Sequence, residues 1–267
     1  MVPEDTHKAA CQARARFPRG LEQPAGALRF GADALLLAAF ATGYCDRTSR
    51  SFTVAELGSG CGAALLALAL SCPEVRGIGL EREEALTTAA RRNARTLGLE
   101  GCLHFLCTDV ADVHSWQRWE NRMDMVMTNP PYGLPGQGRT SSSPLREKAL
   151  RDGPALAVFC RAAARLLRHH GRFCCIFEAA GLTRMVMALE AARLGLRRIL
   201  PLRPHGRSPA TRLLLEARKN AAAQPVLEAP LTLHIPGPAA PARWTRRALA
   251  FCPWLHTARE DAHELHS

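Results

Sequence analysis

Four consecutive residues, Asn129-Pro130-Pro131-Tyr132, carry the most specific chemistry in this sequence. They directly follow the apolar segment 124–128, which predicts a buried strand. The Asn129 side-chain oxygen and the Pro130 carbonyl can both accept hydrogen bonds from a planar amino group, and the prolines fix the direction of that carbonyl. Tyr132 can stack on a flat substrate. An ordinary tight turn is the alternative, but it leaves the aromatic ring unexplained. Asn129, Pro130 and Tyr132 are therefore the predicted catalytic residues, which would hold a weakly nucleophilic amine in line with an electrophile.

A glycine-rich turn carries the second group of candidate residues. It reads Glu56-Leu57-Gly58-Ser59-Gly60-Cys61-Gly62, between an expected strand and an expected helix. Glycines permit a sharp turn and let a ligand approach the backbone, and the helix that follows offers its first amides. The spacing G-x-G-x-G differs from the dinucleotide fingerprint G-x-G-x-x-G, which argues against a nicotinamide-dependent dehydrogenase. The candidate ligand-binding residues here are Glu56, Gly58, Gly60 and Gly62.

Two acidic residues close the next two expected strands. Glu81 follows segment 75–80, where a carboxylate can accept hydrogen bonds from both hydroxyls of a ribose. Asp109 follows segment 102–107 and can accept from an adenine amino group. A third acid, Asp33, precedes an apolar, helix-prone segment and is a candidate N-cap.

Strand-like and helix-like segments alternate along the chain, which predicts a doubly wound α/β sheet. The strand-like segments are 52–57, 75–80, 102–107, 124–128, 172–177, 197–202 and 212–217. The helix-like segments that separate them include 63–71, 83–97, 154–169 and 182–194. Because the carboxyl ends of the strands line the ligand crevice of such a sheet, the candidate residues should gather at one edge.

The sequence divides into an N-terminal extension of residues 1–28, a main domain of residues 29–235 and a Pro-rich tail of residues 236–267. The repeated prolines from Pro225 onward argue against a regular element there. Residues 133–153, rich in Gly, Pro, Ser and charge, are expected to form a long loop.

Charge is distributed unevenly along the 267 residues. The net charge is +11, and residues 139–219 alone carry 17 basic and five acidic side chains. We call residues 139–219 the basic stretch. Arginine forks match phosphate oxygens, so the basic stretch predicts nucleic-acid binding, with a plain solvated surface as the alternative.

Ten cysteines are scattered through the chain without a CxxC pair or a zinc-like His/Cys spacing, which predicts reduced thiols and no metal site. No apolar run approaches the ~20 residues of a membrane span, and the first residues lack a signal-peptide pattern. We therefore expect a soluble cytoplasmic protein that makes no membrane contact.

These motifs together resemble the class I S-adenosylmethionine-dependent methyltransferases that act on planar amino groups. More narrowly, segments 30–40, 200–201, 212–219 and 230–233 are similar to those of bacterial tRNA(Val) adenine-37 N6-methyltransferases, so that the resemblance covers roughly residues 28–235. The resemblance implies a Rossmann-like, seven-stranded sheet, mostly parallel, with one antiparallel strand near the edge. It also implies S-adenosyl-L-methionine as the cofactor, and RNA, with tRNA as the expected kind, as the partner bound by the basic stretch.

The resemblance assigns roles to individual residues. The three glycines would cradle the methionine part of the cofactor, Glu81 its ribose and Asp109 its adenine. Asn129 through Tyr132 would hold the target adenine. The implied cofactor-binding residues are Asp33, Glu56, Gly58, Gly60, Gly62, Glu81, Asp109 and Asn129. The sequence departs from the family at Ala32, where threonine is usual, and in its long loop and Pro-rich tail.

Three other functions remain open at this stage. Release-factor methyltransferases, which modify the planar amide of a protein glutamine at N5, share Asn-Pro-Pro-Tyr. They usually carry a sizeable N-terminal helical domain, whereas only about 28 residues precede the core here. Methylation of guanine N2 in ribosomal RNA is a second alternative. A non-catalytic RNA-binding module is a third, and the intact cofactor and Asn129-Pro130-Pro131-Tyr132 motifs argue against it.

Overall fold

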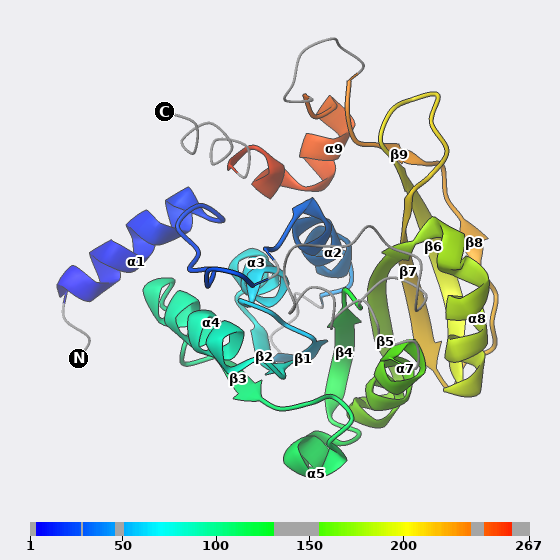
Figure 1. The fold of residues 1–267 in the computed structure, drawn as a ribbon, viewed down its shortest axis with the longest axis horizontal. Coiled ribbons are helices and arrows are strands. Elements are labelled where there is room, and N and C mark those ends of the chain that lie inside the picture. Colours follow the sequence, from blue (N-terminus) through cyan, green and yellow to red (C-terminus); the bar gives the residue numbers. More distant parts are fainter. Residues whose placement is uncertain (1–3, 28, 46–50, 131–154, 236–242, 258–267) are drawn as a thin grey trace.

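A central sheet lies between two layers of helices in the computed structural model, which describes residues 4–27, 29–45, 51–130, 155–235 and 243–257 (Figure 1). The strands are β1 Phe52–Leu57, β2 Val75–Glu81, β3 Leu103–Cys107, β4 Met123–Thr128, β5 Leu167–Glu178, β6 Leu194–Arg203, β7 Arg212–Lys219, β8 Val226–Leu227 and β9 Leu231–Thr232. The helices are α1 Glu4–Arg16, α2 Ala32–Thr42, α3 Ala63–Ser71, α4 Glu84–Thr96, α5 Val113–Trp116, α7 Ala155–Leu166, α8 Leu182–Ala191 and α9 Arg246–Phe251.

The order of the strands defines where a ligand can bind. Along the sheet the order is β3-β2-β1-β4-β5-β7-β6-β8, and β9 also pairs with β6. The pairs from β3 to β5 are parallel, whereas β7 runs antiparallel to both β5 and β6. Between β1 and β4 the direction of winding reverses, and the carboxyl edge of a sheet at such a switch point is where α/β proteins bind ligands.

Both faces of the sheet are buried. In β1, Val54 packs in the layer that contains the leucines of α2 and α3, whereas Ala55 packs in the opposite layer with residues of α7 and α8. Because strands covered on both faces need apolar residues at successive positions, they appear in the sequence as nearly continuous apolar runs.

The predicted α/β fold is confirmed, but the predicted number of strands, seven, is wrong. Within the described residues the sheet has nine strands, and the two additional ones are the two-residue strands β8 and β9. They pair in parallel with β6, and Pro225 and Pro230 each immediately precede one of them. A proline in front of so short a strand removes no hydrogen bond within the pairing, so these prolines do not prevent it. The single predicted antiparallel strand is β7.

The expectation of no regular element beyond Pro225 is also wrong. Besides β8 and β9, α9 forms after Thr245, whose hydroxyl caps the helix by accepting from the Ala248 amide at 3.0 Å. Cys252 and Leu255 are completely buried, and the Cys252 thiol donates to the Leu35 carbonyl of α2. The apolar face of this short segment therefore completes the layer around α2. The division at residues 28 and 235 remains a prediction.

All ten cysteines lie in the described ranges, and none forms a disulfide. Six of them are buried, and burial raises the pKa of Cys160 and of Cys252 to about 12. Across the described ranges, no helix is long and apolar enough to cross a bilayer. The same part of the chain contains no group of three or more His, Cys, Asp or Glu residues arranged to hold a metal ion.

Candidate active site

The two chemistry-bearing motifs meet where β1 and β4 end. Leu57 and Thr128 are direct partners in the parallel register, and the Thr128 hydroxyl donates to the Leu57 carbonyl at 2.8 Å. Gly58 and Asn129, the next residues of the two strands, therefore leave the sheet side by side. This is the switch point at which the fold favours ligand binding.

The glycine-rich loop, residues 58–62, uses glycine where a side chain would be strained. Gly58, Gly60 and Gly62 have φ values of +69°, +54° and +87°, a region that other residues rarely adopt. A Cβ atom on Gly62 would lie 2.9 Å from Cζ of Phe105, whereas one on Gly60 would meet nothing within 4 Å. The loop thus packs tightly against β3 at one end and leaves its middle open to a ligand.

Glu81 faces this loop from the end of β2. Its Oε2 accepts from the Gly60 amide at 2.9 Å and its Oε1 from the Glu83 amide at 3.0 Å. Burial raises the pKa of Glu81, while both amide hydrogen bonds favour the ionised form and oppose that shift. A carboxylate has about four acceptor positions, so Glu81 is fixed in orientation and keeps acceptors for a diol.

Asp109 lies after β3 at the same edge of the sheet. Its Oδ1 accepts from the Ala111 amide at 2.8 Å, and the residue is exposed. This local hydrogen bond orients the carboxylate beyond the strand end, where an amino group could reach it.

Glu56 has a different environment from the other candidate residues. It is only 3% exposed, and its Oε2 accepts from the Leu65 amide in the first turn of α3 at 3.0 Å. Burial raises its pKa to about 8. These contacts make Glu56 a buried support of α3, and direct contact with a ligand remains a prediction.

Asp33 is not the N-cap of its helix. The N-cap of α2 is Gly31, without a side-chain hydrogen bond, and Asp33 lies in the first turn. Its Oδ2 accepts from Nε of Arg212 at 3.1 Å, at the start of β7. Because β7 is antiparallel, its start lies at the same edge as the ends of β1 and β4. The Arg212 guanidinium offers a stronger partner than the helix amides, which explains why the capping prediction failed.

The described part of the Asn129-Pro130-Pro131-Tyr132 motif ends at Pro130. Asn129 is half-buried and Pro130 is buried, directly after β4. Pro131 and Tyr132 lie outside the described residues, so the stacking role of Tyr132 remains a prediction.

Asn93 supports the site and is not among the residues that the sequence motifs indicate. Its Nδ2 donates to the Cys61 carbonyl in the glycine-rich loop at 3.0 Å and to the Glu22 carbonyl at 3.1 Å. Its Oδ1 accepts from the Glu22 amide at 2.7 Å. Asn93 thereby ties the chain before α2 to the loop. The available signal was an amide on the apolar face of the helix expected at 83–97.

Many arginines in the described part of the basic stretch are neutralised within the protein. Residues 139–154 of the stretch lie outside the described residues. Seven arginines in the remainder form ion pairs with carboxylates, namely Arg165, Arg168, Arg172, Arg184, Arg198, Arg212 and Arg218. The charge count along the sequence therefore overstates the positive charge that this stretch can offer to a partner.

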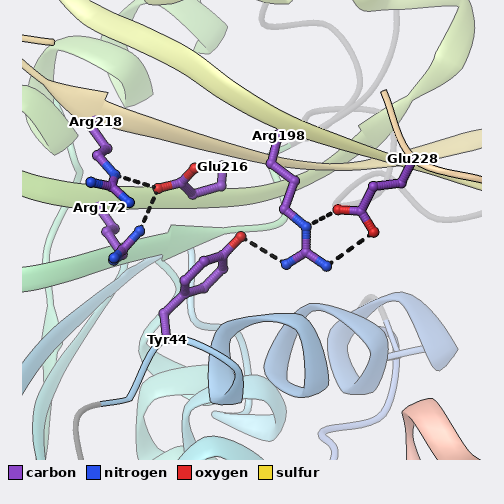
Figure 2. Close-up of polar contacts among 6 residues, drawn as sticks. All are labelled: Tyr44, Arg172, Arg198, Glu216, Arg218 and Glu228. Atoms are coloured by element: carbon purple, nitrogen blue, oxygen red, sulfur yellow. Dashed lines mark hydrogen bonds and ion pairs between the residues drawn. The ribbon is translucent and has the colours of Figure 1, made fainter. Parts of the chain in front are cut away.

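Figure 2 shows how three of these arginines serve the fold. Glu216, only 2% exposed, accepts from Arg172 at 2.8 Å and from Arg218 at 3.0 Å. Arg198 pairs with Glu228 and donates to the Tyr44 hydroxyl at 2.9 Å. Tyr44 follows α2, so this network fastens the end of that helix to the sheet.

The comparisons with known proteins identify the family. Residues 64–199 match the model of the family described as "RMKL-like, methyltransferase domain". The chain belongs to this methyltransferase family. It is a class I methyltransferase that uses S-adenosylmethionine, which confirms the expectation from the sequence.

Two curated proteins are similar in sequence. The chain is 29% identical over 192 residues to the tRNA1(Val) (adenine(37)-N6)-methyltransferase of Erwinia tasmaniensis, in an alignment that covers 71% of this chain and 74% of that protein. It is 35% identical over 133 residues to the release factor glutamine methyltransferase of Moorella thermoacetica, covering 45% of this chain and 44% of that one.

Solved structures share the fold. A protein from Agrobacterium tumefaciens, described as a predicted O-methyltransferase, has a TM-score of 0.66 at 23% identity and covers 83% of this chain and 96% of its own. A geranyl diphosphate methyltransferase in complex with SAM has a TM-score of 0.50 at 12% identity, and the match covers 69% of this chain and 85% of that one.

The residues at the switch point fit S-adenosylmethionine. The open side of Gly60 leaves room for the methionine part, and the fixed Glu81 carboxylate suits the two ribose hydroxyls. Asp109 offers an exposed acceptor for the adenine amino group.

Proposed function

We propose that this enzyme methylates the exocyclic N6 amine of an adenine in RNA, with the anticodon loop of a tRNA as the substrate. The observation that carries the proposal is the direct pairing of β4 with β1, which sets Asn129 and Pro130 beside the glycine-rich loop. The similarity to a protein named as a tRNA adenine N6-methyltransferase supports the choice of acceptor. An RNA substrate of this kind accords with a cytoplasmic enzyme.

The chemistry requires positioning more than acid–base catalysis. Bound S-adenosylmethionine supplies an electrophilic methyl group on a sulfonium. The Asn129 side-chain oxygen and the Pro130 carbonyl would accept the two N–H groups of the target amine and orient its lone pair toward the methyl group. No strong base is needed, because the proton can leave after the transfer.

The target base must leave its stack before it can reach Asn129. Unstacking costs a few kcal/mol in a duplex and less in a loop. Anticodon loops present unpaired bases that proteins can splay out, so this substrate reduces the cost that the enzyme must offset.

Protein glutamine is the second candidate acceptor, because this chain is also similar to relatives named as release factor glutamine methyltransferases. A glutamine amide presents the same planar NH2 group to Asn129 and Pro130. Arg203 and Arg207, which pair with no carboxylate in the part of the chain that the structure describes, favour RNA over a peptide loop.

One experiment separates these acceptors. The purified protein is incubated with labelled S-adenosylmethionine and either undermethylated total RNA or a release factor, and the products are analysed by mass spectrometry. We expect N6-methyladenosine from the RNA. N2-methylguanosine, or label only in the release-factor glutamine, would contradict the proposal.

A further inference from the structure

A group of aromatic rings lies at the ligand edge of the sheet, away from the residues discussed so far. His205 follows β6 and His234 follows β9, at the carboxyl ends of two parallel, paired strands. The His234 and Trp244 rings pack against each other at a tilt, with centroids 4.3 Å apart and planes 32° apart, and the ring centroid of His205 lies 6.0 Å from that of His234. We call these three residues the ring stack. Trp244 remains half-buried.

The ring stack is held by backbone pairing. The His234 amide donates to the Pro204 carbonyl at 2.8 Å. His234 and Trp244 form an antiparallel bridge, and the Thr245 amide donates to the Leu233 carbonyl at 2.8 Å. The rings are thus presented by regular, hydrogen-bonded backbone.

Unpaired positive charge collects around the ring stack. Arg203 is held by the Thr232 hydroxyl at 2.8 Å, through Nε. Five arginines flank the rings in sequence, and none of them pairs with a carboxylate within the described residues. They are Arg203, Arg207, Arg243, Arg246 and Arg247. This contrasts with the seven neutralised arginines of the basic stretch. Three of the five lie outside that stretch altogether.

The distance between the two sites is suited to one nucleic-acid strand. β4 and β6 are three strand spacings apart, which corresponds to about 14 Å. Asn129 and the ring stack therefore lie at the same edge but cannot contact the same base. Aromatic rings flanked by arginines are the usual means of binding unstacked bases and their phosphates.

We infer that the ring stack and its flanking arginines bind a second, unstacked nucleotide of the RNA whose adenine is methylated at Asn129. The base stacks against the Trp244 side of the rings, and the arginines contact its phosphates. This inference rests on the proposed function, because it assumes RNA as the acceptor.

Variants at Trp244 and Arg207 test the inference. The probe is a fluorescently labelled, unmodified anticodon stem-loop of tRNA(Val), and binding is followed by anisotropy at several salt concentrations. Trp244→Leu loses one base–aromatic stack, so its Kd for the stem-loop should be at least about fivefold higher than that of the wild type. The Kd of Trp244→Phe should stay within about twofold of the wild-type value. Arg207→Glu should also weaken binding and flatten its salt dependence.

The control variant is Arg118→Glu. Arg118 is exposed and lies over the Trp119 ring at 3.9 Å, but before β4, at the opposite edge of the sheet. It should bind the stem-loop like the wild type. Calorimetry with S-adenosylmethionine, unchanged in all variants, shows that each one is folded.

The possible failures are distinguishable. If the wild type methylates RNA but Trp244→Leu and Arg207→Glu bind the stem-loop with wild-type affinity, the second nucleotide site is wrong. If the wild type methylates a glutamine-containing peptide and no RNA, the proposed function fails, and the inference fails with it.

Discussion

Glu56 and Glu81 are both buried acids beside the glycine-rich loop, but their hydrogen bonds differ. Glu81 accepts from two backbone amides, which support its charge, whereas Glu56 accepts from one and has a pKa of about 8. At neutral pH Glu56 is therefore mainly protonated, which suits a support of α3. The sequence shows two equivalent glutamates, and only the buried contacts separate their roles.

The raised pKa of Glu56 predicts a pH-dependent stability. The folded state binds this proton more tightly than the unfolded chain, so protonation of Glu56 stabilises the fold. This contribution to stability is fully present below about pH 4.5 and is lost as pH rises through about 8. Through this group the free energy of unfolding should fall by on the order of 4 kcal/mol between pH 5 and 8.5 in the wild type, and Glu56→Gln should abolish that fall. Urea denaturation of both proteins across this range measures it, and parallel pH profiles would contradict it.

Asn129 is implied as both a catalytic and a cofactor-binding residue, and we expect its side chain to contribute mainly to turnover. Loss of its acceptor oxygen in Asn129→Ala should misplace the target amine and lower kcat about 100-fold, with unchanged affinity for S-adenosylmethionine. Steady-state kinetics and calorimetry measure the two quantities. Asn121→Gly, which removes an amide before the other end of β4 at a residue with φ of +57°, is the control. Comparable kcat values for both variants would remove Asn129 from the mechanism.

The elements that could be predicted are those that local sequence determines. The strand 52–57 and the helix 63–71 have the predicted bounds, because glycines and a proline bracket them. The helix expected at 154–169 ends at Leu166, since Leu167 instead pairs with Met123 of β4. Such a pairing between distant segments leaves no local signal, and the same holds for β8 and β9.

Asn93 shows how one helix controls a loop on another element. Asn93→Leu leaves the Cys61 carbonyl and the Glu22 backbone groups without a partner, and should raise the Kd for S-adenosylmethionine roughly tenfold. Calorimetry measures this change. The control is Arg92→Ala, which removes an exposed ion pair to Glu22 of 2.9 Å that is worth little. Equal affinities for both variants would show that the tie does not shape the loop.

At the scale of the whole molecule, the first and last described segments share one core. Phe17 is 1% exposed and packs edge-on against Trp254 with ring centroids 5.0 Å apart. The Thr257 hydroxyl donates to the Phe17 carbonyl at 2.7 Å. The sequence predicted an extension and a tail, because a contact across some 240 positions cannot be read from composition. The arginine ion pairs escaped prediction for the same reason.

This shared core predicts a large effect of one substitution. Phe17→Ala should lower the free energy of unfolding by about 3 kcal/mol or more, since it empties a buried aromatic volume. Urea denaturation provides the measurement. Met187→Ala, at a residue 66% exposed, should change stability by no more than about 0.5 kcal/mol. A similar small effect for Phe17→Ala would mean that the two segments do not stabilise each other.

The buried cysteines have a practical consequence. A thiol reacts with alkylating reagents as its thiolate, and Cys160 and Cys252 are both inaccessible and protonated in the folded protein. Exposed Cys107 should be labelled quickly, and the interior thiols only when their part of the chain opens. Cys160 lies in α7 and Cys252 in the segment after α9. The labelling rates of these two native thiols would therefore measure local opening of the two helical layers separately.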